Sequence, residues 1–91
     1  MDELRLDGNA VAGVLHAVFG LEMTEARGAC AGCGKTEPIG AEHAYVHAPG
    51  TVLRCCHCDT VLIVLVQAHE EYVLAFPGLK SLQLRAESLS A

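Results

Sequence analysis

The hydrophobic positions of this chain follow a helical spacing near the start and a strand spacing from about residue 40 onward. A helix is predicted over about residues 9–19, where apolar side chains recur every three or four positions. Asp7 or Asn9 can cap its start, and Gly20 stands where a helix is expected to end. Residues 21–29 are expected to form an extended lead into the next segment. The apolar stripe of the helix consists of Val11, Val14, Leu15 and Val18.

The second part of the chain predicts antiparallel strands joined by tight turns. Residues 43–48 alternate between apolar and polar side chains, and Pro49-Gly50 fits the centre of a type II turn that leads into a return strand over 51–55. Residues 59–67 carry apolar side chains on both faces, which predicts a central strand covered on both faces. Residues 69–76 are expected to pair with this strand.

The end of the chain adds one more turn and strand. Pro77-Gly78 predicts a turn, and residues 79–85 predict a last strand. Residues 86–91 are expected to be a flexible tail. No repeat or linker divides the sequence, so we expect a single domain over residues 1–91.

Composition supports a small globular protein. Hydrophobic residues make up 52% of the chain and charged residues 19%, which is the reverse of the pattern in disordered proteins. With no Trp and only two Tyr and two Phe, the core must be aliphatic. A chain of 91 residues buries little surface and often depends on a metal, disulfides or a second subunit.

Charge argues against nucleic-acid binding, and the length of the apolar runs argues against a membrane span. Six Lys and Arg residues stand against 11 Asp and Glu residues, giving a net charge of −5, and the basic residues are scattered singly. Nucleic-acid surfaces need clustered cations and usually aromatic side chains for stacking. The longest apolar run, residues 61–66, is too short for a membrane span of about 20 residues. The start of the chain does not resemble an export signal, so a cytoplasmic location with reduced thiols is expected.

The cysteines carry the clearest chemical signal. Cys30 and Cys33 form one C-x-x-C pair, and Cys55 and Cys58 form a second pair after 21 intervening residues. Two such pairs supply the four sulfurs of a tetrahedral metal site, in which Zn–S bonds of about 2.3 Å place neighbouring sulfurs about 3.5–4 Å apart. The turn of each pair is expected to direct backbone N–H groups toward its first sulfur.

Several nearby residues have simpler roles than metal binding. The position after each second Cys favours positive φ, which Gly34 adopts freely and Asp59 tolerates. Cys56 is interpreted as a small apolar filler beside the metal, with a reactive thiol as the alternative. His57 is placed at the tip of the turn, with a substitute ligand as its alternative role. His43 and His47 are four apart, which on a strand spans about 13 Å and is too far to share an ion.

Zinc and iron both accept four thiolates, and zinc is favoured here. Iron carriers of the rubredoxin type share the "CxxCG" pairs, but they usually surround the site with several aromatic residues on a shorter chain. Four protein ligands leave no open coordination position, so the site is expected to be structural. No arrangement of nucleophile and base and no phosphate-binding loop is evident, so an enzyme is not expected.

The motif "CAGCG…CCHCD", with a helix before it and a hydrophobic hairpin after it, resembles the zinc-ribbon superfamily. The segments "LDGNAVAGVLHAVFGLEMTEARGACAGCG", "YVHAPGTVLRC" and "CDTVLIVLV" are similar to a family of short actinobacterial proteins of unknown function. In that family the position of Cys56 is more often Pro. The resemblance implies a zinc-ribbon-like fold with metal binding at Cys30, Cys33, Cys55 and Cys58, and it implies no activity.

The combined prediction is an α+β domain with an N-terminal helix over about 9–19 and a small, antiparallel, metal-held sheet over about 22–85. The expected function is protein–protein interaction with an unidentified partner or with a second copy. A rubredoxin-like iron electron carrier and a nucleic-acid or transcription accessory zinc ribbon are the alternatives. Metal delivery, as in nickel chaperones with a similar ribbon, is disfavoured because those proteins carry His where this chain has Asp2.

Overall fold

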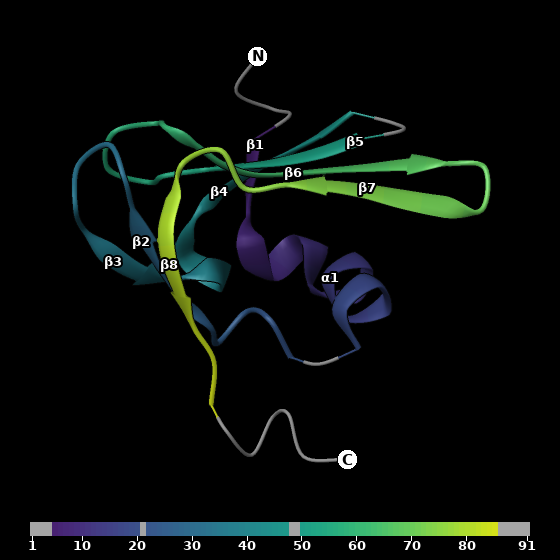
Figure 1. Cartoon of the computed structure of the whole chain (residues 1–91), viewed down its shortest axis with the longest axis horizontal. Coiled ribbons are helices and arrows are strands. Elements are labelled where there is room, and N and C mark those ends of the chain that lie inside the picture. The colour runs from purple at the N-terminus through teal and green to yellow at the C-terminus, as the bar shows by residue number, and fades with distance from the viewer. Residues whose placement is uncertain (1–4, 21, 48–49, 86–91) are drawn as a thin grey trace.

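The computed structural model describes residues 5–20, 22–47 and 50–85, which form one helix and two antiparallel sheets. The α+β class and the N-terminal helix are therefore confirmed. Figure 1 shows the larger sheet across the top of the molecule with α1 beneath it, and the smaller sheet of β2, β3 and β8 at one end. No helix in the described part of the chain is long and apolar enough to cross a membrane.

The helical segment begins as a 3-10 turn. The Asp7 side chain accepts a hydrogen bond from the Ala10 N–H at 3.1 Å, which confirms one of the two predicted caps. Gly20 ends the helix in the left-handed conformation with φ of 73°, and its N–H donates to the His16 carbonyl. The helical elements are the 3-10 turn η2 (Gly8–Val11), α1 (Ala12–Phe19) and the 3-10 turn η3 (Ile39–Ala41).

The larger sheet has the order β1-β4-β5-β6-β7. Its first hairpin pairs Ala44 with Leu53 and Tyr45 with Val52, as the alternating pattern predicts. The predicted type II turn includes Pro49, which lies outside the described residues. The strands are β1 (Arg5–Asp7), β4 (His43–His47), β5 (Gly50–Arg54), β6 (Val61–Ala68) and β7 (Glu71–Ala75).

The smaller sheet has the order β3-β2-β8 and was not predicted as a separate unit. The extended lead forms β2 (Arg27–Cys30), which pairs with β3 (Thr36–Pro38) on one side. The predicted last strand is β8 (Leu79–Gln83), but it pairs with β2 rather than extending the sheet of β6 and β7. Residues 86–91, the predicted tail, lie outside the described residues.

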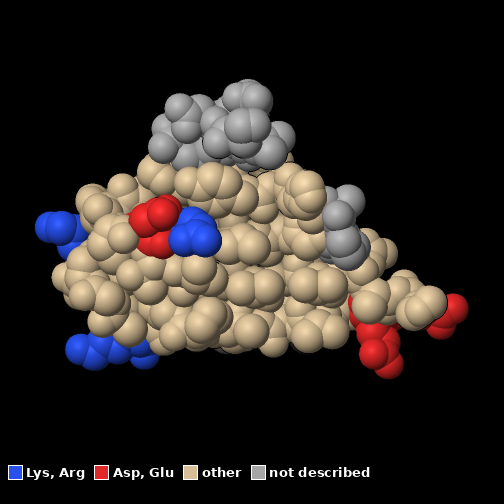
Figure 2. All heavy atoms as spheres, turned by 90° about the horizontal axis from the view of Figure 1, so that it is seen from above, with Lys and Arg blue, Asp and Glu red and all other residues tan. Residues whose placement is uncertain are grey.

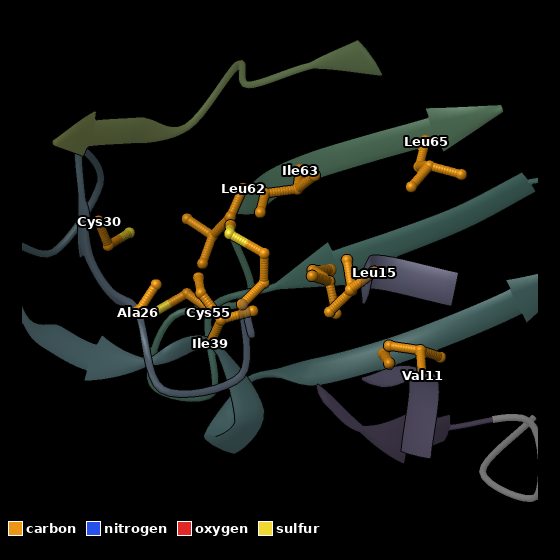
Figure 3. Packing of buried hydrophobic residues seen from close by; sticks show 12 residues of the cluster. Val11, Leu15, Ala26, Cys30, Ile39, Cys55, Leu62, Ile63 and Leu65 are labelled. Carbon is orange, nitrogen blue, oxygen red and sulfur yellow. The ribbon is translucent and has the colours of Figure 1, made fainter. Parts of the chain in front are cut away.

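The prediction that β6 is covered on both faces is wrong. Ile63 and Leu65 are buried on one face, and Leu62 is buried at the start of the strand, where the register with β5 shifts. Val64 and Val66 point to the face opposite to Ile63 and Leu65 and stay partly exposed. The reason is size, because α1 has eight residues and spans only about 12 Å at about 1.5 Å per residue. One short helix covers one face of the sheet. Figure 3 shows how Leu15 of this helix meets the buried side chains of the strands.

Candidate metal centre

The first C-x-x-C turn follows the end of β2. Its backbone closes through two hydrogen bonds, from the Cys30 N–H to the Lys35 carbonyl and from the Gly34 N–H to the Cys30 carbonyl, both at 2.9 Å. Gly34 has the predicted positive φ, at 81°. The Gly32 N–H donates to the Cys30 sulfur at 3.3 Å, so the turn directs a backbone dipole at its first cysteine as expected.

The second turn, between β5 and β6, repeats this geometry. The Cys55 N–H donates to the Thr60 carbonyl at 2.8 Å, and the Asp59 N–H donates to the Cys55 carbonyl at 2.9 Å. Asp59 has φ of 69°, which confirms the predicted left-handed position. The His57 N–H donates to the Cys55 sulfur at 3.4 Å. The two turns are thus built alike although they come from different sheets.

Arg54 closes the second turn from outside. Its guanidinium donates to the Asp59 carbonyl oxygen at 3.0 Å, and its Nη1 lies 3.6 Å from the carboxylate of the same residue. The guanidinium also lies over the Tyr45 ring, 5.8 Å from its centroid. Because both charged side chains are well exposed, this ion pair contributes little to stability and mainly orders the turn.

The four cysteine sulfurs converge as the spacing predicted. The Sγ atoms of Cys30 and Cys58 are 3.5 Å apart, those of Cys33 and Cys55 are 3.7 Å apart, and all four lie within 4.8 Å of one another. Sulfurs on a zinc tetrahedron with bonds of about 2.3 Å are separated by about 3.8 Å. The donor set and its spacing therefore fit a metal ion, and this cluster can bind one.

One cysteine of each pair is buried and the other is exposed. Cys30 and Cys55 belong to the hydrophobic core, whereas Cys33 and Cys58 face solvent. Figure 3 shows Cys30 and Cys55 approaching the core from separate segments of the chain. The Cys58 sulfur lies 3.0 Å from the Thr60 hydroxyl oxygen. A metal held here would sit at the border between the core and solvent.

The thiols of the cluster differ in acidity. Burial raises the pKa of Cys30, but hydrogen bonds from the Cys33 and Gly32 backbone N–H groups outweigh it and lower the value from 9.0 to about 6. Burial dominates at Cys55 and raises its pKa to about 12, against opposing hydrogen bonds from the His57 and Cys58 backbones. A metal that enters the cluster must displace the proton of Cys55, so binding releases protons.

Cys56 and His57 lie outside the sulfur cluster. The Cys56 thiol is partly buried, and its pKa is raised by this burial and by the neighbouring Glu42 carboxylate. The His57 Nε2 atom lies 2.7 Å from the Glu37 carboxylate, so its ring contacts an acidic side chain that follows the first turn. This contact, which sequence reasoning missed, links the second turn to strand β3 on the surface.

Glu42 is a second residue that sequence reasoning missed. Its side chain is 1% exposed, and its Oε1 accepts a hydrogen bond from the Cys56 N–H at 3.0 Å. A buried carboxylate is costly unless it is hydrogen-bonded, and here it satisfies the backbone at the centre of the second turn. The buried Glu42 therefore holds the backbone of the turn at Cys56, while the exposed Arg54 contacts it at Asp59.

The histidines do not extend the cluster. His43 and His47 stand at opposite ends of β4, as their strand spacing predicted. Within residues 5–20, 22–47 and 50–85, the group of Cys, His, Asp and Glu side chains close enough to hold one ion consists of the four cysteines alone.

Comparison with known proteins gives one match. The sequence profile of a family described as "Family of unknown function (DUF6510)" matches residues 2–87, which is nearly the whole chain. No curated protein and no solved structure matches the chain.

Proposed function

We propose that this chain, which belongs to the DUF6510 family of unknown function, is a small zinc protein that acts by binding another protein. In this proposal the four cysteines hold zinc for structural purposes. Four thiolates fill the coordination sphere of zinc and leave no position for substrate or water. A structural zinc contributes roughly 10–16 kcal/mol of apparent binding free energy, which is as large as the whole stability of a small domain.

The observation that carries the interaction role is an uncovered sheet face. We call the side of the larger sheet opposite to α1 the outer face. Figure 2, which looks onto this side, shows charged side chains mainly at the ends of the molecule and a broad uncharged area between them. An uncovered sheet face that carries apolar side chains can mark an interaction site in a soluble protein. The cross-strand register places Tyr45, Val52, Val64, Val66 and Val73 on it.

The charge distribution supports a protein as the partner. The chain carries a net charge of −5, and the uncharged area has no cluster of cations that would attract phosphate groups. Among the outer-face side chains named above, Tyr45 alone is aromatic, whereas surfaces that stack bases usually carry several rings. The nucleic-acid alternative therefore gains no support from this face.

Two measurements test the proposal. Elemental analysis and an absorption spectrum of untagged protein purified without added metal should show one zinc per chain and no visible bands. Iron with thiolate-to-iron charge-transfer bands would instead support an electron carrier.

The interaction role is tested by photo-crosslinking in cells that produce the protein. A photoreactive amino acid at Val66 on the outer face should form covalent adducts with protein. The same amino acid at Ala17, exposed on α1, is the matched control and should not. Equal adduct formation at both positions, or none at either, would contradict the proposal.

A further inference from the structure

Strand β7 forms an edge of the larger sheet without the features that usually protect such edges. Exposed edges are normally kept short or carry Lys, Pro or a bulge, because unpaired N–H and C=O groups invite another strand. Among the described edges, β1 has three residues and ends in Asp7, β3 has three residues and ends in Pro38, and β8 contains the exposed Lys80. β7 has five residues, regular pairing with β6, and no Lys or Pro.

In the part of the chain that the structure describes, four of the six exposed large hydrophobic side chains lie on this strand or just after it. Tyr72 is 41% exposed, Val73 56%, Leu74 36% and Phe76 42%. The acidic residues lie at the start of this strand: Glu70 belongs to the turn before it, and Glu71 is its first residue. An edge of this composition is suited to pairing with an apolar strand.

The register of the β6–β7 hairpin shows which backbone groups are available. Residues 69–70 form the two-residue turn, with His69 at φ of 58°, so the flanking pair Ala68 and Glu71 exchanges hydrogen bonds. Hydrogen-bonded and non-hydrogen-bonded pairs alternate from there. The backbone groups of Val73 therefore point to β6, and those of Tyr72 and Leu74 point outward to the free edge.

We propose that two copies of this chain pair antiparallel through β7, about a two-fold axis that passes through Val73. This register places the outward N–H and C=O groups of Tyr72 opposite those of Leu74 in the other copy, and the symmetry repeats the pair, giving four hydrogen bonds. All five residues of the strand are then paired. This contact uses the edge of the larger sheet and goes beyond the proposed function, which concerns the outer face.

The charges are compatible with this arrangement. In the proposed register Glu71 lies opposite Ala75 of the other copy and Glu70 lies opposite Phe76, so no two acidic side chains face each other. Val73 lies opposite Val73 of the other copy, and both side chains are on the outer face. Such a pair without mutual hydrogen bonds brings the two Cβ atoms to about 4.5–5.5 Å. Antiparallel strands of this kind extend both sheets into one continuous sheet with α1 on the same side in each copy.

The surface area that the two copies would bury sets the expected affinity of their pairing. The exposed fractions of Tyr72, Val73, Leu74 and Phe76 are given above. If each side chain has a surface of about 150–250 Å², the apolar area that pairing would bury is about 350 Å² per copy. The total of about 700 Å² is below the roughly 1,200 Å² of a standard stable interface, so the pair belongs to the weak class. Dissociation constants of roughly 10 µM to 1 mM are expected for such a contact.

Placing charged residues at position 73 tests whether the two-fold axis of the dimer passes through this residue. Sedimentation of the full, metal-loaded chain should show mass rising toward the dimer over the expected concentration range. The Val73→Lys and Val73→Glu variants should each associate about tenfold more weakly, because like charges then face each other, and an equal mixture of the two should recover association. Val73 is exposed, so metal content and circular dichroism should stay unchanged.

A backbone variant provides the second measurement. Tyr72→Pro removes an outward N–H without touching the bonds to β6, and it should abolish association, whereas Tyr72→Phe keeps the N–H and should pair like the original chain. Stronger self-association of Val73→Lys would place Val73 opposite Glu71 and overturn the proposed register. Unchanged association of all variants would overturn the role of β7 and leave another contact surface for the proposed function. A strictly monomeric chain would overturn self-pairing, while the crosslinks at Val66 decide the proposed function separately.

Discussion

The assignment of the metal centre makes a sharp prediction about two cysteines that are two positions apart in one turn. Cys58→Ser removes a sulfur that lies 3.5 Å from the Cys30 sulfur, whereas Cys56→Ser changes a thiol outside the cluster. The first variant should bind zinc much more weakly, and the second should bind it like the original chain.

The usual binding free energy of a structural zinc sets the size of the difference. If each of the four sulfurs supplies an equal part of the roughly 10–16 kcal/mol of apparent zinc binding, the loss of Cys58 costs about 3 kcal/mol, or about 100-fold in affinity. Because a small domain has only about 5–15 kcal/mol of total stability, this variant should also melt at a much lower temperature. Cys56→Ser changes a partly buried thiol and should cost less than about 1 kcal/mol.

Competition with a coloured zinc chelator at pH 7 measures the affinity of each variant, and thermal unfolding followed by circular dichroism measures its stability. The original chain and Cys56→Ser should give matching titrations, with Cys58→Ser shifted by about two decades. If Cys56→Ser lost zinc as readily as Cys58→Ser, or if Cys58→Ser kept the affinity of the original chain, the four-sulfur assignment would be refuted.

Three other predictions concern residues around the centre. Gly32→Ala should weaken zinc binding in the same chelator titration, because the added methyl would overlap the Thr60 hydroxyl and touch the Cys58 sulfur, whereas Gly13→Ala on the exposed side of α1 should stabilise by about 0.5–1 kcal/mol. Glu42→Ala should lower the free energy of unfolding in urea by about 1–3 kcal/mol, since it leaves the Cys56 N–H without its acceptor, and Glu42→Gln should cost less because it keeps an oxygen there. In the zinc-loaded protein one thiol, Cys56, should react with a thiol reagent at pH 7, and slowly because its pKa is raised; all five cysteines should react after zinc is removed.

Each of these predictions has a result that contradicts it. Equal zinc affinity in the two glycine variants would mean that the first turn has room for a side chain. Equal stability of the two Glu42 variants would show that the hydrogen bond to the Cys56 N–H does not contribute to stability. A second thiol that reacts before zinc is removed would show that one of the four cysteines is not bound.

The local geometry of the metal centre could be predicted from the sequence because it depends on neighbouring residues. Cys-x-x-Cys spacing fixes the separation of two sulfurs within one turn, and the residue that follows must adopt positive φ. Gly34 and Asp59 both do so. The helix end at Gly20 and the pairing of the β4–β5 hairpin follow from equally local signals.

The remaining features depend on contacts between distant segments. β2 pairs with β8, about fifty residues later. The pattern of apolar and polar residues in either strand does not indicate which strand it pairs with. Glu42 was missed because its acceptor role depends on the Cys56 N–H, which only the folded turn brings near. The coverage of β6 was predicted wrongly because apolar side chains on both faces do not show whether the chain has enough helix to cover them.

The four cysteines join two sheets that are otherwise distinct. Cys30 ends a strand of the smaller sheet, and Cys55 and Cys58 lie between two strands of the larger one. The Ala31 N–H also donates to the Gly78 carbonyl at 2.8 Å, in the turn where the chain passes from β7 to β8. With a metal bound, a mechanical load applied between the two sheets would pass through metal–sulfur bonds as well as through side-chain packing. Removal of the metal would leave the hydrogen bonds within each sheet in place. It would allow the two sheets to change their orientation relative to each other, because the metal–sulfur bonds between them would be gone.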